Sequence, residues 1–264
     1  FPALSLLLAA ALPGMNALAA GSPLQLVRAG DIIEVRLRGR PVAAYVGGAG
    51  ELPPGVPEVY RRGGYLHPLF TPSGRVVTGD YPTNHIHHHG VWTAWTKTEF
   101  DGRAPDFWNM GQRKGRVEFA GLPGTRVTRD FAEIRARHRF VDLTAGPPGT
   151  GLEGTWRIPV PPTPPGEPPL LALDIPQRNV TGRPLRLPEY HYGGLGFRGP
   201  NPWDGVANVR FLTSEGLTNR VTGNGTRARW CWMGGLSDGT LAGVALLGHP
   251  DNFRAPEPMR LHPH

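Results

Sequence analysis

The chain has little cysteine and, beyond residue 20, no long apolar run, and both absences restrict its class. Cys231 is the only cysteine among 264 residues, so the chain holds neither an intramolecular disulfide nor a metal site built from paired cysteines. A domain of this length can bury a core large enough to fold without disulfides. After residue 20 no stretch is apolar enough to span a bilayer, so we expect no membrane insertion once a leader is removed.

Several short catalytic and binding motifs are also missing. The sequence contains no Gly-x-Ser-x-Gly elbow, phosphate-binding loop, dinucleotide fingerprint or His-Glu-x-x-His pair. The net charge is +7, but the basic residues are dispersed: over residues 135–139 arginines alternate with Ala and His, as on the solvent face of a strand. A nucleic-acid-binding protein gathers basic residues around a groove-reading element. We therefore predict no nucleic-acid partner.

Residues 1–20 differ from the rest of the chain. An apolar run from Leu4 to Leu12 is followed by small residues, with Ala17-Leu18-Ala19 where a signal peptidase would cut. This pattern predicts a signal peptide over 1–20, export to the periplasm or the extracellular space, and a single mature domain over 21–264. The patterned stretch at 259–264 stops abruptly, which predicts a domain truncated at its C-terminus.

The remaining pattern is that of short strands joined by turns. Glycine and proline are abundant, at 37 and 30 residues, and they separate short apolar runs. Apolar residues alternate with charged ones over residues 33–38, and alternation recurs over 171–175 and 209–211, whereas 240–248 is predicted to be a buried strand. We predict an all-β fold with few or no long helices: a large antiparallel β-sandwich of the mutarotase-like supersandwich or jelly-roll type. The proline-rich residues 161–169 are predicted to form a surface connection within that domain.

The densest chemical feature is a tract with four histidines in five residues, His85, His87, His88 and His89. In an extended chain His85, His87 and His89 would share one face and His88 the other. Imidazoles at this spacing can bind Zn²⁺, Cu²⁺ or Ni²⁺, or supply an acid and a base around one ligand. The alternative is a cluster whose rings only bond the backbone and stack on nearby tryptophans.

Two later stretches combine histidine with other polar residues. The first contains Glu189, His191 and Arg198 among glycines and tyrosines, and its alternative is an ordinary strand with a bulge. The second follows the strand predicted at 240–248 and contains His249, Asn252 and Arg254; its alternative is an ordered surface turn. Arg75, in another turn-like stretch, is a weaker candidate of the same kind.

Taken together, these motifs resemble a known bacterial family. They are Tyr65–Gly74, Asp80-Tyr-Pro82, His85-x-His87-His88-x-Gly90-x-Trp92, Tyr192-Gly-Gly-Leu-Gly-Phe-Arg198 and His249-Pro-x-Asn252-x-Arg254-x-Pro256. The chain is similar from about residue 37 onward to the family catalogued as "methane oxygenase PmoA". The resemblance implies a soluble β-sandwich, common in carbohydrate-degrading bacteria, that continues past the end of this chain.

The leading hypothesis is an exported carbohydrate-active enzyme whose ligand is a small molecule or an oligosaccharide. His87 or His88 would be the general acid and Glu189 or His191 the general base, because histidine titrates near neutral pH without tuning. The residues predicted to bind the substrate are Arg75, His85, Trp92, Tyr192, Arg198, His249, Asn252 and Arg254.

Two other hypotheses stay open at this point. In a metal-dependent enzyme, a divalent cation would be held by His85 and His87 together with His191 or His249. In a non-catalytic carbohydrate-binding module, the tryptophans would form the platform. All three hypotheses require the three polar stretches to meet in the folded protein.

Overall fold

The computed structural model describes residues 22–262 and shows an antiparallel all-β sandwich. The predicted signal peptide lies outside the described residues, so export stays a prediction. One large sheet has the order β1-β2-β3-β4-β5-β13. Its strands are β1 (Leu24–Ala29), β2 (Ile32–Leu37), β3 (Arg40–Val46), β4 (Tyr65–Leu69), β5 (Val91–Ala94) and β13 (Gly194–Phe197).

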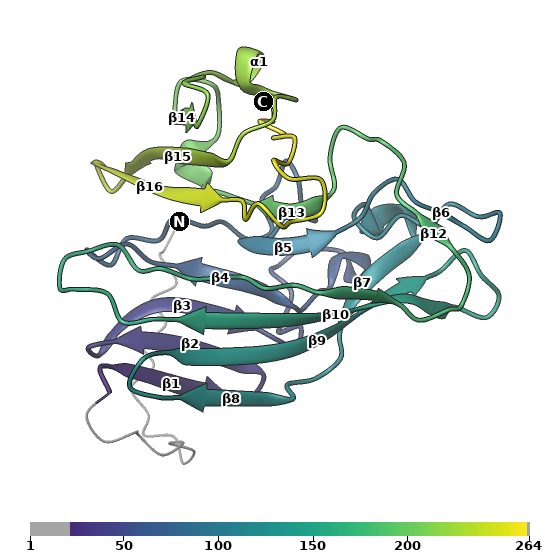
Figure 1. Ribbon diagram of the computed structural model, residues 1–264, viewed down its shortest axis with the longest axis horizontal. Helices are drawn as coiled ribbons and strands as arrows, with labels where there is room; N and C mark the ends of the chain where they lie inside the picture. Colours follow the sequence, from purple (N-terminus) through teal and green to yellow (C-terminus); the bar gives the residue numbers. More distant parts are fainter. Residues whose placement is uncertain (1–21, 263–264) are drawn as a thin grey trace.

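A second large sheet faces the first, with the order β11-β10-β9-β7 and with β8 also paired to β9 (Figure 1). Its strands are β7 (Gly115–Phe119), β8 (Gly124–Val127), β9 (Ala132–Asp142), β10 (Gly149–Val160) and β11 (Gln177–Asn179). Two smaller sheets pair β6 (Glu99–Phe100) with β12 (Leu185–Arg186), and β14 (Val209–Thr213), β15 (Trp230–Ser237) and β16 (Thr240–Leu247) in that order.

Helical segments in the described part of the chain are all short, as the sequence predicts. They are the 3-10 turns η1 (Glu58–Tyr60), η2 (Met110–Gln112) and η3 (Asn201–Trp203), and the α-helix α1 (Arg220–Gly223). None of the helices in residues 22–262 has the length and apolar character needed to cross a membrane. The predicted fold class, an all-β sandwich without long helices, is therefore confirmed.

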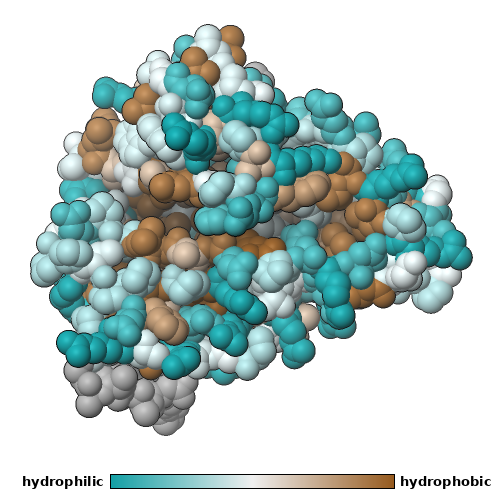
Figure 2. Space-filling view, in the orientation of Figure 1, coloured by the Kyte–Doolittle hydropathy of each residue, from teal (hydrophilic) through white to brown (hydrophobic). Residues whose placement is uncertain are grey.

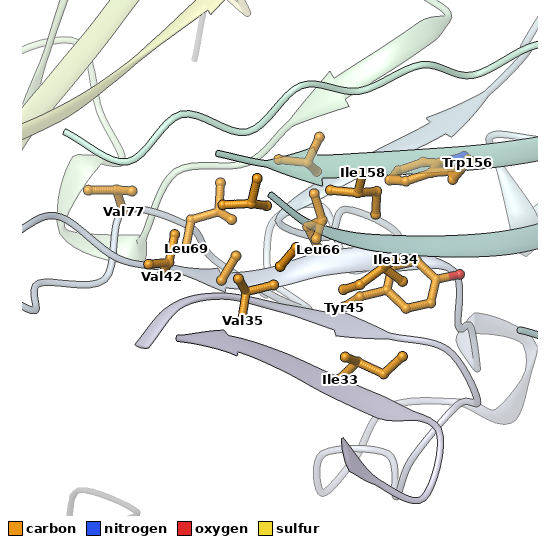
Figure 3. Close-up of a cluster of buried hydrophobic side chains, with 14 of the residues drawn as sticks. Ile33, Val35, Val42, Tyr45, Leu66, Leu69, Val77, Ile134, Trp156 and Ile158 are labelled. Atoms are coloured by element: carbon orange, nitrogen blue, oxygen red, sulfur yellow. The ribbon is translucent and has the colours of Figure 1, made fainter. Parts of the chain in front are cut away.

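The alternating residues of the strands meet between the two large sheets (Figure 3). Ile33 and Val35 point inward from β2 and are fully buried, while Glu34 between them is partly exposed. Trp156 and Ile158 of β10 approach from the opposite sheet, and both are 0 % exposed. Burying such side chains stabilises the fold by about 1.5–3 kcal/mol each, so this layer holds the scaffold on which the loops are displayed.

Two predicted strands differ in the structure from their expected form. Leu171, Leu173 and Ile175 do pack on the core from one face, but their segment is not a strand; it joins β10 through the bridge between Arg157 and Asp174 and through the amide of Ala172, which donates to the carbonyl of Pro159. β16 forms where predicted, yet it is not buried, because the core covers only one of its faces. Figure 2 shows apolar patches along the border between the three-stranded sheet and the sandwich. The predicted domain boundaries stay a prediction.

Candidate functional site

The backbone of the histidine tract folds into turns and is not extended. The amide of His85 donates to the carbonyl of Pro82 over 3.1 Å, and the amide of His88 donates to the carbonyl of His85 over 2.8 Å. Asn84 sits in the first turn, a position that asparagine favours. The predicted alternation of faces is therefore wrong: the turns gather three of the histidine rings together and send the fourth, His89, inward.

His89 is a buried anchor bonded to a carboxylate. Its ring is 0 % exposed, and its Nδ1 lies 2.6 Å from Oδ1 of Asp80. The other carboxylate oxygen accepts a 2.9 Å hydrogen bond from the Tyr65 hydroxyl, and the His89 ring stacks on Tyr65 with centroids 4.5 Å apart. Burial lowers the pKa of His89, although the bond to Asp80 opposes the shift. A neutral His89 donates from Nδ1 to Asp80, which fixes its tautomer.

The other three tract histidines, together with His262, form what we call the histidine cluster: His85, His87, His88 and His262. The His85 and His88 rings stack with centroids 4.8 Å apart, and His87 meets His88 edge-on at 4.6 Å. His262, from the far end of the described chain, contacts His85 at 4.7 Å. All four are partly exposed, so they form the surface layer of the site above the buried His89.

Two members of the cluster, His87 and His88, are neutral at physiological pH. Burial, followed by the neighbouring histidines, lowers the pKa of His87 to about 4 and that of His88 to about 2. A neutral imidazole accepts a proton but has no acidic proton to give at pH 7. The predicted general-acid role of His87 or His88 therefore does not fit the free protein, because burial stabilises the form that acts as a base.

Buried aromatic rings support the cluster from below. Trp92 lies 5.0 Å from the His88 ring and 4.9 Å from Trp108, and it is only 1 % exposed. A Cβ atom at Gly196, its cross-strand partner on β13, would lie 2.6 Å from the indole, so glycine is required there. The predicted substrate-binding role of Trp92 is not supported, because a covered indole cannot stack on a ligand; it holds His88 in place.

Arg198 is brought to the tract, as the sequence predicts. It follows β13, and its Nη2 donates to both carboxylate oxygens of Asp204, over 2.6 and 2.7 Å, and to Asn84 over 3.2 Å. Arg220 donates to the backbone carbonyl of His262. These bonds connect the second polar stretch and α1 to the histidine cluster.

The rest of the second stretch reaches the cluster through aromatic contacts. Tyr192 packs edge-on against Trp108 with centroids 5.5 Å apart, and its hydroxyl is 3.0 Å from the Asn109 side-chain amide. His191 is exposed and contacts the ring of Tyr192 at 4.8 Å. Glu189 is exposed, and its side chain makes no hydrogen bond to any described residue. The second stretch therefore borders the histidine cluster, with Trp108 between them.

The third stretch does not contribute its polar groups to the cluster. His249 is in an exposed turn, with Nδ1 3.7 Å from the Asp251 carboxylate. Asn252 donates to Glu257 over 2.7 Å, and Arg254 donates to the carbonyl of Leu187 over 2.5 Å. These groups are engaged within their own turn or on the neighbouring loop, so the turn interpretation describes them better than the substrate-binding one.

The hydrogen bonds of the Arg75 side chain also go to residues outside the histidine cluster. Its Nε donates to the carbonyl of Ser237 over 3.1 Å, and Nη2 donates to Thr240 over 3.0 Å. Ser237 ends β15 and Thr240 begins β16, so Arg75 fastens this hairpin to the sandwich. This explains Arg75 as a structural residue and leaves the substrate-binding prediction without support.

No metal site is assembled in the part of the chain that the structure describes. Within residues 22–262, no three His, Cys, Asp or Glu side chains gather so that they could hold a metal ion. The predicted set of His85, His87, His191 and His249 is not assembled, because His191 lies among tyrosines and His249 lies in its exposed turn.

Sequence reasoning missed the layer beneath the cluster. Asp80, Tyr65 and Tyr81 belong to the quoted motifs, but only the turns of the tract bring them around His89. Arg62 gave no signal at all: it is 2 % exposed, donates to the Thr93 carbonyl over 2.8 Å, and burial lowers its pKa to about 10. A buried arginine in an Arg-Arg-Gly-Gly stretch could be found only from coordinates.

Comparison with known proteins gives one result. No curated protein and no solved structure matches the chain. A family model described as a family of unknown function, DUF6807, matches residues 32–264. This match does not test the resemblance to the methane oxygenase PmoA family, which stays a prediction. Because the match covers most of the sequence, the chain belongs to the DUF6807 family.

Proposed function

We propose that this protein is an enzyme that acts on a sugar or glycoside by acid-base chemistry at the histidine cluster. The observation that carries the proposal is the cluster itself. Its imidazoles are partly exposed, His87 and His88 among them are neutral, and buried tryptophans support them and join them through Trp108 to a second polar stretch. A fixed, partly desolvated imidazole is the most common general base in enzymes. Export, as the N-terminal pattern predicts, would place the enzyme where extracellular glycans are degraded.

Within this proposal His87 is the general base. Its pKa of about 4 is closer to the working range than that of His88, at about 2, and a base acts best when its pKa is near the ambient pH. His88, held between His85 and Trp92, orients His87 through their edge-on contact. On the same aromatic floor the Tyr192 hydroxyl accepts a hydrogen bond from the Asn109 side-chain amide, which fixes its position.

Exposed aromatic side chains on the second and third polar stretches favour a carbohydrate ligand. Tyr190 is 43 % exposed and Phe253 is 61 % exposed, and Phe253 contacts Trp95 at 6.3 Å. Flat apolar ring faces at the surface can stack on the C–H faces of sugars while nearby polar groups bond the hydroxyls. These rings, and not the buried Trp92, are the stacking surface in this proposal.

The proposal is tested by turnover of a panel of glycans, glycosides and keto-glycosides by the full chain. His87→Gln keeps the shape and polarity of the side chain but removes the base, and we expect a loss of about 100-fold or more in kcat. Arg139→Gln, an exposed substitution on β9, is the control. An active wild-type enzyme whose kcat is unchanged by His87→Gln would contradict the assignment of His87, and absence of turnover on every carbohydrate would contradict the enzyme.

A non-catalytic carbohydrate-binding module is the second candidate, and the exposure of Tyr190 and Phe253 favours it. The two candidates differ in what His87→Gln does. A binding module would retain sugars with unchanged affinity in this variant and would show no turnover in either form. Tyr190→Ala would weaken binding in both cases, because stacking area is lost in both.

A further inference from the structure

A groove outside the histidine cluster opens between η1, η2 and the start of β7. Its volume is about 470 Å³, which lies within the range of sites that hold small molecules, roughly 300–1,000 Å³. None of the residues that line it belongs to the histidine cluster or to the three polar stretches. The groove is therefore a separate candidate site, with its own chemistry to explain.

Close contacts at two glycines fix the walls of this groove. A Cβ atom at Gly111 of η2 would lie 2.5 Å from the Tyr60 hydroxyl of η1, and one at Gly115 of β7 would lie 2.9 Å from the Asp106 carbonyl oxygen and from the Phe107 ring. Only glycine permits such approaches, because any side chain would force the backbone apart. The groove is therefore built into the packing of these elements.

The floor of the groove is apolar. Met110 is only 2 % exposed, and Val59 and Leu143 are partly exposed on either side of it in the chain. Pockets for small molecules combine such an apolar lining with a few polar groups that fix the orientation of the ligand. A methionine sulfur also makes favourable contacts with aromatic rings. This floor therefore suits the flat body of an aromatic ligand.

Two of the arginines that line the groove are already paired with carboxylates. Arg61 donates to Glu58 from Nε over 2.6 Å and from Nη2 over 3.0 Å, and this bond lowers the pKa of Glu58. Arg116 donates from Nε to Glu118 over 2.7 Å. These two pairs neutralise one another, so they leave the charge of the groove to the remaining side chains.

Arg113 is the lining residue whose positive charge has no partner. Its side chain is exposed, and within residues 22–262 it makes no hydrogen bond and no ion pair; the same holds for the neighbouring Lys114. Both side chains are charged at neutral pH. The excess positive charge at this rim therefore comes from an arginine and a lysine and depends on no histidine.

The backbone at Arg113 is strained. Its φ is 56°, in the left-handed region that glycine adopts freely and other residues adopt at an energetic cost. Strain of this kind concentrates at ligand-binding and active sites. A free guanidinium held at the edge of an apolar floor can donate two parallel hydrogen bonds to a carboxylate.

We propose that this groove binds a small aromatic carboxylate, with its ring on the apolar floor at Met110 and its carboxylate on Arg113. The proposal does not depend on the function assigned to the histidine cluster, because the two sites share no lining residue. The carboxylate supplies the charge that Arg113 lacks, and the ring covers the apolar side chains that the groove leaves open to water.

The test compares 2-naphthoate with 2-naphthamide, which has the same shape and no charge. Both are titrated into the full chain by calorimetry at low and high salt. We expect the naphthoate to bind at least about 10-fold more tightly, with an advantage that shrinks as salt screens the charges. Acetate, which has the charge without the ring, should bind at least about 10-fold more weakly than the naphthoate. Val59→Thr should weaken both naphthyl ligands by about 3-fold, because it makes the floor more polar.

Two variants of Arg113 test the role of its charge. Arg113→Gln should bring the affinity for naphthoate down to that for naphthamide. Arg113→Gly should do the same while keeping or raising the urea midpoint, because glycine relieves the left-handed backbone. Arg210→Gln, an exposed substitution on β14, is the control and should change neither affinity by more than about 2-fold.

Three results would overturn the proposal. The first is equal affinity of the wild-type protein for naphthoate and naphthamide. The second is a preference for naphthoate that survives in both Arg113 variants, because the carboxylate would then lie elsewhere. The third is absence of binding of either ligand at millimolar concentration. All three would leave the proposed carbohydrate function standing, since no residue of the histidine cluster lines this groove.

Discussion

His88 and His89 are neighbours in the chain, yet the fold uses them in opposite ways. His89 is fully buried, bonds Asp80 through Nδ1 and packs against Tyr65. His88 lies at the partly exposed surface and is held by ring contacts to His85, His87 and Trp92. The comparison teaches that two adjacent histidines of one tract can belong to different layers, one a buried anchor and the other part of the surface.

His138 belongs with His89 on the anchoring side of this comparison. It is 1 % exposed on β9, and its Nε2 lies 2.6 Å from the Tyr45 hydroxyl. Burial, and then the charge of Arg62, lowers its pKa to about 3. Because a buried polar group is costly to leave without its partner, the anchoring histidines should control stability and the cluster should control function.

Removing His89 should produce the largest effect. His89→Ala deletes a buried ring between two tyrosines and removes the imidazole partner of the Asp80 carboxylate, so we expect a loss of about 3 kcal/mol in the free energy of unfolding. His88→Ala, one residue earlier, should cost less than about 1.5 kcal/mol because its site is partly open. Urea unfolding measures both values, and equal losses would erase the division between the two layers.

Tyr45→Phe should have the next largest effect. It removes only the hydroxyl that bonds His138, so the packing of the ring on β3 is kept and the buried Nε2 loses its partner. The expected loss is about 1–3 kcal/mol. Tyr190→Phe is the matched control, because this exposed tyrosine has no hydroxyl bond to an anchoring histidine. A Tyr45→Phe protein as stable as the control would show that His138 does not need this bond.

Lowering the pH should destabilise the folded protein in a graded way. The folded state lowers the pKa of His88 to about 2 and that of His87 to about 4, whereas an unfolded histidine titrates near 6.5. The unfolded state thus binds more protons, so this stability is complete above about pH 6.5 and declines as the pH falls toward 4. Each such histidine contributes at most about 1.4 kcal/mol per pH unit. His88→Gln should flatten the fall in urea midpoint between pH 6.5 and 4.5; an unchanged slope would contradict burial of His88 as its cause.

The sequence predicted the fold far better than the site, for a physical reason. Alternation over 33–38 reports directly which side chains face the core, because strand periodicity is a local property, and Ile33 and Val35 are indeed buried. The tract could be recognised as chemically rich, and Arg198 was correctly brought beside it. Its turns could not be predicted, since they depend on the bond between His89 and Asp80 and on contacts from β4 and β13.

The third polar stretch also shows that the composition of a segment does not reveal whether it forms a site. His249, Asn252 and Arg254 have the composition of a site, but composition does not reveal where a donor finds its acceptor. In the structure Asn252 bonds Glu257 and Arg254 bonds the backbone of Leu187. One of these acceptors lies in the same turn and the other on a distant loop, and the spacing of residues in the sequence predicts neither pairing.

His249→Ala should give the smallest loss in the free energy of unfolding, because His249 is the most exposed histidine in this comparison. Its side chain is 69 % exposed, and its contact with Asp251 is a solvent-accessible pair, which contributes little to stability. The free energy of unfolding should change by less than about 0.5 kcal/mol, well below the loss expected for His88→Ala or His89→Ala. A loss above about 1.5 kcal/mol would mean that His249 has a buried partner in the folded protein. The third stretch would then belong with the anchoring histidines and not with the surface turns.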